Sequence, residues 1–227
     1  MNWLELGAGV YARRYTELDQ TIGLVVGTLG CLVIDTGPDE VHGAELAAAV
    51  RAVTPLPWTV VLTHAHFDHV FGTAAFSPCP VWAHDRCLPA LHTIEPHRDD
   101  WVERYRAQGD VERADRLAAA RLVLPTDLLT DRVTLDLGDR EVALVHPGPG
   151  HTDHDVVVHV PDAGVVFAGD LVEQGAPPSA GPDAVLAAWP AALDAVLALG
   201  AEVIVPGHGE PVDRTFVLAQ RDELALR

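Results

Sequence analysis

The segment Thr63-His64-Ala65-His66-Phe67-Asp68-His69 places three imidazoles and one carboxylate within six consecutive positions. Imidazole and carboxylate groups are ligands for borderline divalent metals such as zinc. The segment follows residues 58–62, a short apolar run typical of a strand buried on both faces, and ligand sites in α/β sheets lie beyond such strands. In an extended loop His64 and His66 point to the same side, so both can bind one ion, while the Asp68-His69 pair can turn toward another. We therefore predict a metal site here rather than a histidine-rich surface loop.

Three further candidate ligands follow apolar runs and stand in glycine-rich sequence. They are His151 in PGPGHT (147–152), Asp170 in VVFAGD (165–170) and His208 in VIVPGHG (203–209). Glycine allows the backbone to bend tightly around a metal centre. A single Asp or His in such a place is usually a turn former or a solvated residue. Because three of them repeat the strand-then-turn setting of the first cluster, we predict that all of them share one site.

The order and setting of these residues resemble the ligand set of the metallo-β-lactamase superfamily. The segment Val33-Ile34-Asp35-Thr36-Gly37 also resembles the first motif of that family, whose Asp supports the metal ligands from behind. The resemblance runs from residue 33 to residue 209 and so covers nearly the whole chain. It implies an α/β (α+β) fold, a four-layer αββα sandwich with the metals at the sheet edge.

The resemblance also implies two Zn²⁺ ions per chain, with iron or manganese as the other metals to consider. One ion would be bound by His64, His66 and His151, the other by Asp68, His69 and His208, and Asp170 would bridge the two. Water shared by two divalent ions loses a proton near neutral pH and becomes a nucleophile. Asp68, the expected catalytic residue, would orient this hydroxide and handle protons as the tetrahedral intermediate collapses.

The remaining sequence predicts a single domain over residues 1–227. Apolar, β-branched runs predict strands at 10–15, 21–28, 31–34 and 58–62, and again at 133–137, 141–146, 156–160, 165–168 and 202–205. Helices are expected at 38–53, 182–199 and 215–226. Residues 86–127 are rich in Arg, Asp, Glu and Ala, and they predict a helical insertion that caps the site. Trp101 and Tyr105 in this insertion are candidates for substrate contact, and ordinary packing is the alternative.

Charge and composition narrow the class of partner. The 33 acidic and 15 basic residues give a formal charge of −18, which disfavours nucleic acid and anionic membranes. We find neither a transmembrane run nor a signal peptide, so we expect a cytoplasmic protein. The 3 cysteines are expected to be reduced. The expected partner is therefore a small-molecule substrate. The oligomeric state is open, and a dimer through the inserted helices is one option.

Three positions bear on the substrate. The β-lactamase subgroup that these motifs resemble has Cys in place of Asp170, Arg in place of His69 and commonly Lys in place of Glu173. Glu173, if it contacts substrate rather than solvent, would repel the carboxylate of a β-lactam, so at most weak β-lactamase activity is expected. Asp170 together with His69 is instead similar to glyoxalase II-like thioesterases and lactonases. The resemblance thus favours hydrolysis of a small ester, thioester or lactone.

Two other classes of function are consistent with the same residues. One is an iron-dependent redox member of the superfamily, similar to persulfide dioxygenases, which visible absorbance would distinguish from a zinc enzyme. The other is a binding or regulatory module whose metals are only structural. Loss of activity without loss of folding in an Asp68→Asn variant would argue against the second alternative.

Overall fold

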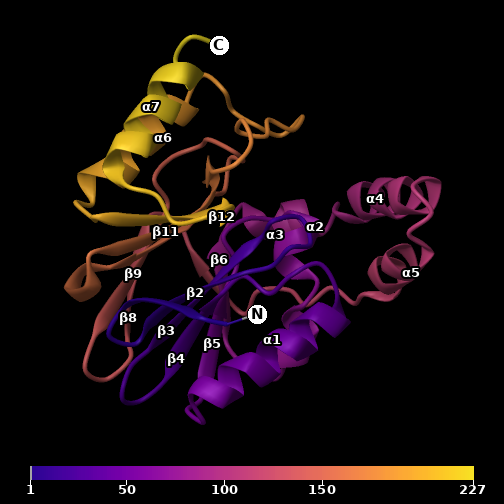
Figure 1. Cartoon of the computed structure of the whole chain (residues 1–227), viewed down its shortest axis with the longest axis horizontal. Coiled ribbons are helices and arrows are strands. Elements are labelled where there is room, and N and C mark those ends of the chain that lie inside the picture. Colours follow the sequence, from indigo (N-terminus) through magenta and orange to yellow (C-terminus); the bar gives the residue numbers. More distant parts are fainter. Residues whose placement is uncertain (1) are drawn as a thin grey trace.

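The computed structural model describes residues 2–227, which form two β-sheets packed face to face with helices on both outer faces (Figure 1). The first sheet has the order β1-β2-β3-β4-β5-β6-β7, with the bounds Leu4–Gly7, Val10–Arg14, Thr21–Val26, Cys31–Ile34, Trp58–Val61, Val81–His84 and Asp127–Leu129. The second has the order β12-β11-β10-β9-β8, with the bounds Val203–His208, Val165–Glu173, Val157–Val160, Glu141–Val145 and Arg132–Asp136. Neighbours from β4 to β7 run parallel, as do β11 and β12, and the other neighbours are antiparallel.

The helices lie in two groups. Those on the side of the first sheet are α1 (Glu40–Val53), α2 (Phe67–Val70), α3 (Cys87–Leu91), α4 (Glu95–Ala107) and α5 (Val111–Ala119), with the 3₁₀ turn η1 (Thr73–Phe76). On the side of the second sheet are α6 (Trp189–Ala198) and α7 (Arg214–Leu224), and η2 (Pro161–Ala163) joins β10 to β11. Figure 1 shows α4 and α5 projecting beyond the edge of the sheets. They therefore stand beside the end of the sandwich rather than over its face.

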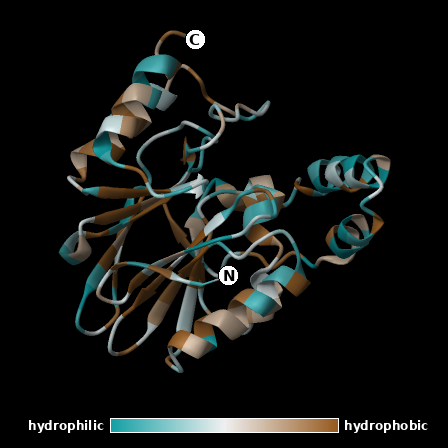
Figure 2. Cartoon of the chain, in the orientation of Figure 1, coloured by the Kyte–Doolittle hydropathy of each residue, from teal (hydrophilic) through white to brown (hydrophobic). Residues whose placement is uncertain are grey.

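Three hydrophobic clusters fill the spaces between the layers, which is the arrangement that an αββα sandwich requires. Successive side chains of a strand point to opposite faces, and β4 shows the effect. Cys31 and Val33 pack toward the helices of the first layer, whereas Leu32 and Ile34 pack between the sheets. β4 is thus buried on both faces and apolar at every position, and Figure 2 shows central strands that are largely brown. The predicted four-layer fold is confirmed.

Several element predictions need correction. The predicted helical insertion is present as α3, α4 and α5, but strands β1, β6 and β7 were not predicted. β1 and β7 are the edge strands of the first sheet and are only partly buried, so no continuous apolar run marks them. The helix predicted from residue 182 begins only at Trp189, and residues 174–188 form a loop. Pro190 lies inside the predicted helix, and because proline is tolerated only in the first turn of a helix, α6 begins directly before it.

Two expectations from composition can be compared with the structure. None of the helices within residues 2–227 is long and apolar enough to cross a membrane. Cys31, Cys79 and Cys87 are free thiols, and Cys31 and Cys87 are buried in the helical layer.

Candidate metal centre

The structure brings the seven predicted ligands together at one edge of the sandwich. His64 and His66 leave the end of β5, Asp68 and His69 lie in the one-turn helix α2, and His151 lies in the loop between β9 and β10. Asp170 and His208 were expected in turns but belong to β11 and β12. These two parallel strands change register at Gly169, which has φ +54°, and a side chain at Gly207 would collide with the Asp170 carboxylate. The glycines therefore permit a backbone bend beside the ligands, but this bend lies inside β11 and β12 and not in turns that follow the strands.

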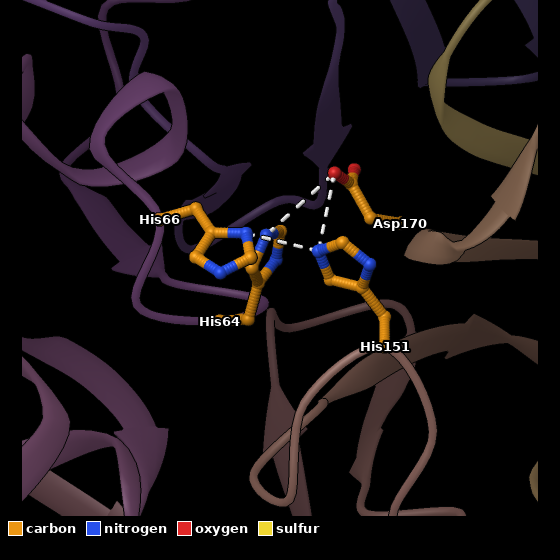
Figure 3. Close-up of side chains that lie close together, drawn as sticks. All are labelled: His64, His66, His151 and Asp170. Atoms are coloured by element: carbon orange, nitrogen blue, oxygen red, sulfur yellow. Dashed lines mark hydrogen bonds and ion pairs between the residues drawn. The ribbon is translucent and has the colours of Figure 1, made fainter. Parts of the chain in front are cut away.

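The ligand atoms form two adjoining groups. In the first group, which Figure 3 shows, the atoms of His64, His66, His151 and Asp170 lie within 4.8 Å of one another. The second group, with the same spacing, contains Asp68, His69 and His208. Asp170 lies between the groups, since its Oδ2 is 3.5 Å from His151 Nε2 and 3.3 Å from His208 Nε2. The carboxylate of Asp170 thus adjoins both groups of ligand atoms.

Each imidazole is oriented by a hydrogen bond from its outer nitrogen. The acceptors are Thr63 Oγ1 for His64 Nδ1 (2.9 Å), Asp183 Oδ2 for His66 Nε2 (2.9 Å), Asp35 Oδ2 for His69 Nδ1 (2.8 Å), Ser179 O for His151 Nδ1 (3.0 Å) and Leu18 O for His208 Nδ1 (2.7 Å). The inner nitrogen of every ring consequently faces the other ligands. This is the usual arrangement around metal-bound histidines.

The residues present fit metal ions. His64 Nε2, His69 Nε2 and Asp170 Oδ1 are buried atoms without a hydrogen-bond partner among the described residues. Leaving such atoms unpaired costs free energy, so a cation between them would satisfy the group. The donors are imidazole nitrogens and carboxylate oxygens only, a set that suits zinc and also accommodates iron.

Asp35 is hydrogen-bonded to one candidate ligand and to the residue that precedes another. Its carboxylate accepts hydrogen bonds from the backbone N–H and the hydroxyl of Thr63 and from His69 Nδ1, each 2.8 Å long. Its backbone has φ +63°, a left-handed conformation that is unfavourable for residues other than glycine. Leu18, whose carbonyl accepts from His208, is also left-handed, with φ +58°. Backbone strain of this kind is concentrated where it places polar groups at a site.

Burial and neighbouring charges set the protonation of the ligands. Burial lowers the pKa of His151 to about 4 and that of His64 further below its ordinary value, so both rings are neutral and able to bind a cation at neutral pH. Burial also lowers the pKa of His208, but the carboxylates of Asp170 and Asp68 raise it to about 12. A proton and a metal ion therefore compete for His208 Nε2, and metal binding there displaces a proton.

His154, Asp183 and Ser179 were not predicted as part of the site. His154 Nε2 accepts from the N–H of Ala65 (3.1 Å), between two ligands, and His154 Nδ1 donates to Asp153 (2.8 Å). Its position three residues after His151 was the only signal in the sequence. Asp183 and Ser179 stand in the loop 174–188, whose approach to the centre depends on tertiary structure.

A cavity of about 500 Å³ opens beside the ligands. The side chains of Phe67, Ile94 and Trp101 give one part of its lining an apolar surface, and residues of the segment 179–183 form another part. Trp101, a candidate for substrate contact, lines the cavity, whereas Tyr105, the other candidate, is 3% exposed, is packed in the helical layer and is not among the residues that line the cavity.

Glu173 also lines the cavity and is buried rather than a solvated loop acid. Its Oε1 accepts from the N–H of Ser179 (2.8 Å), whose carbonyl in turn orients His151. Burial, together with the charge of Asp170, raises the pKa of Glu173 to about 7. Glu173 therefore connects the loop 174–188 to the ligands.

Comparison with known proteins gives matches over most of the chain. The model of the family described as the metallo-beta-lactamase superfamily matches residues 15–208. The acyl-coenzyme A thioesterase MBLAC2 of Bos taurus is 32% identical over 189 residues, which are 75% of this chain and 66% of that protein. The metallo-beta-lactamase type 2 of Bacillus cereus is 28% identical over 208 residues, which are 89% of this chain and 72% of that protein. The chain thus spans just under two thirds of the length of the thioesterase relative.

Solved structures agree with the fold. A metallo-beta-lactamase from Pontibacter korlensis has a TM-score of 0.74 at 20% identity and covers 97% of this chain and 98% of that chain. A metallo beta lactamase from Erythrobacter litoralis has a TM-score of 0.72 at 22% identity, with 99% and 95% covered. At these identities the likeness concerns the fold alone.

Proposed function

Because the chain belongs to the metallo-β-lactamase superfamily, we propose that it is a metal-dependent hydrolase that cleaves small thioesters at a centre of two zinc ions. The observation that carries the proposal is the pair of adjoining ligand groups, linked by Asp170, at the bottom of one cavity. His64, His66 and His151 would hold one ion, Asp68, His69 and His208 the other. A small-molecule substrate and a cytoplasmic location complete the proposal.

The ions, when bound, would activate a water molecule and polarise the carbonyl oxygen of the substrate. Hydrolysis joins the water oxygen to the carbonyl carbon and breaks the C–S bond, and a proton passes to the departing thiolate. Asp68 is suited to this proton transfer because it lines the cavity and its Oδ2 lies 3.3 Å from His208 Nε2. The hydrogen bonds behind the histidines keep their inner nitrogens aimed at the centre, so the site needs little reorganisation during the reaction.

Two features favour a thioester over the other substrates. The acyl-coenzyme A thioesterases of Bos taurus and Gallus gallus are 32% and 28% identical to this chain. The apolar wall formed by Phe67, Ile94 and Trp101 suits an acyl chain, which gains about 0.8 kcal/mol for each buried methylene. A β-lactam is less suited, because Glu173 stands on the cavity and would repel its carboxylate when ionised.

Metal analysis and a substrate panel test the proposal together. We expect about two zinc ions per chain, no visible absorbance, and higher kcat/KM for acyl thioesters than for aryl esters, lactones or a chromogenic cephalosporin. Bound iron with visible absorbance would instead support a redox enzyme. Protein that takes up zinc but hydrolyses no thioester would contradict the proposed substrate class, and protein that binds no added metal would contradict the centre itself.

A further inference from the structure

Helix α4 places on the cavity wall a guanidinium that no described residue contacts through a hydrogen bond or an ion pair. Arg104 lines the cavity, and within residues 2–227 its side chain makes neither of these contacts. Asp100 precedes it by four residues, the spacing at which helical acid–base pairs form, yet the two are not paired. Arg106, on the same helix but outside the cavity, contacts Glu103 (2.9 Å) and Asp115 (3.7 Å). Arg104 is exposed, so its guanidinium is accessible to an anionic ligand that enters the cavity.

Aromatic packing holds this guanidinium in place. The Arg104 guanidinium carbon lies 4.2 Å from the centre of the Trp101 ring, a distance at which a cation is attracted to an aromatic face. Trp101 packs in turn against Phe67, with ring centres 4.8 Å apart, and Phe67 directly follows the ligand His66. Stacking uses the face of the guanidinium and leaves its N–H edge free to donate. Arg104 is therefore held beside Trp101 at the exposed edge of the cavity, with its donors available.

The acidic groups nearest the centre do not compete for Arg104. Asp183 accepts from His66, and Glu173 accepts from the backbone of Ser179. Acidic groups more than about 10 Å away are largely screened at 0.1 M salt, so the overall charge of −18 has little influence at this point. The Arg104 donors thus offer a local site for an anion on a wall that also carries the unpaired carboxylate of Asp100.

We propose that Arg104 binds a phosphate group on the thiol portion of the substrate, so that the preferred substrates are thioesters of a phosphorylated thiol such as coenzyme A. This inference rests on the proposed thioesterase function. The planar fork of a guanidinium matches phosphate oxygens, and Ile94 and Trp101 on the same wall are apolar and suit the acyl portion. Arg104 thereby selects the substrate by its leaving thiol and has no part in bond cleavage.

A matched pair of substrates tests the assignment. Hexanoyl-coenzyme A and the hexanoyl thioester of N-acetylcysteamine share the acyl group and the thioester, but only the first carries phosphates. For Arg104→Gln, we expect the ratio of kcat/KM for the two substrates to fall about 10-fold, mainly through KM for the coenzyme A ester. Arg106→Gln, the control on the same helix, should leave the ratio unchanged. An unchanged ratio in Arg104→Gln, or an equal fall in both variants, would overturn the assignment.

A binding measurement separates this inference from the proposed function. Desulfo-coenzyme A lacks the thiol and so cannot bind the metal centre through sulfur. In calorimetry with the whole protein, we expect it to bind about 10-fold more weakly to Arg104→Gln than to the wild type or Arg106→Gln. Wild-type protein that hydrolyses neither thioester would contradict the proposed function alone. Equal binding to all three proteins, or none to the wild type, would contradict the role of Arg104 alone.

Discussion

Two regions of the cavity differ in how their polar side chains are bonded: the seven candidate metal ligands, which lie at its bottom, and the residues of α4, which form its wall. At the bottom, the outer nitrogen of every ligand imidazole is bonded to an acceptor, and the ligands are mostly buried. On the wall formed by α4, Asp100 and Arg104 line the cavity without pairing. Groups bonded to the protein are fixed in place, whereas unbonded groups are available to a ligand. The bottom should therefore determine the reaction, and the wall should determine which molecule undergoes it.

Removal of the Asp68 carboxylate should have a larger effect than any change on the wall. Asp68→Asn keeps the size of the side chain but cannot accept the proton, and we expect kcat to fall by at least about 100-fold. Steady-state kinetics, with the zinc content of the same sample, will measure the loss. If activity per bound zinc stays within about tenfold of the wild type, Asp68 acts only as a ligand and the division between bottom and wall is weaker than proposed.

Loss of the contact behind the His64-Ala65-His66 segment should weaken metal binding. His154→Ala removes the acceptor for the Ala65 N–H, and we expect zinc affinity, measured by chelator competition, to fall about 10- to 100-fold. His154→Gln offers an amide oxygen to the same N–H and should recover part of the affinity. The exposed His92→Ala serves as control. Unchanged affinity in His154→Ala would mean that the contacts of His64 with Thr63 and of His66 with Asp183 suffice to hold the segment.

A change on the wall should have a smaller effect and a different kinetic signature. Trp101→Leu shortens the apolar surface and removes the support of Arg104, so we expect KM for hexanoyl-coenzyme A to rise roughly 5-fold while kcat stays within about 2-fold. Steady-state kinetics at saturating metal separates the two constants. A fall in kcat comparable to that of Asp68→Asn would break the distinction between bottom and wall.

A histidine away from both regions should affect stability without affecting activity. The His42 ring packs against Tyr15, with ring centres 4.0 Å apart, and burial lowers its pKa to about 4 although Asp39 and Glu45 oppose the shift. Between about pH 6.5 and pH 4 the unfolded chain binds a proton here that the folded chain does not, so stability should decrease as the pH falls through this range. Urea unfolding at pH 7 and pH 5 should show a smaller decrease for His42→Gln. An identical decrease in both proteins would exclude His42 as the cause.

The same two regions differ in how well the sequence predicts them. The bottom could be predicted because its ligands stand in short motifs at the ends of apolar strands, and Asp35 lies in another such motif. The wall could be predicted only in part. The helices of residues 86–127 and the position of Trp101 were expected, but Tyr105 points into the helical layer, and helical spacing alone does not distinguish these outcomes.

The loop 174–188 shows why the other contacts of the site could not be predicted from the sequence. Asp183 falls within a predicted helix, yet in the structure it accepts from His66, 117 residues away in the sequence. No local pattern encodes a contact of that separation. A bend inside a strand cannot be predicted from the sequence either, because the sequence around Asp170 is equally consistent with a turn and with a strand that changes register at Gly169.

Because the ligands come from distant parts of the chain, metal supply should affect how stable newly synthesised protein is. Four ligands are translated before residue 70 and three after residue 150, and His208 ends the last strand. The emerging chain therefore cannot assemble the centre until β12 has been synthesised. Ions that bind only this completed arrangement would act as a cross-link between the halves, adding about 4 kcal/mol of stability at a free concentration 1,000-fold above Kd. In cells starved of the metal that the centre binds, newly made copies should unfold more often and be degraded sooner.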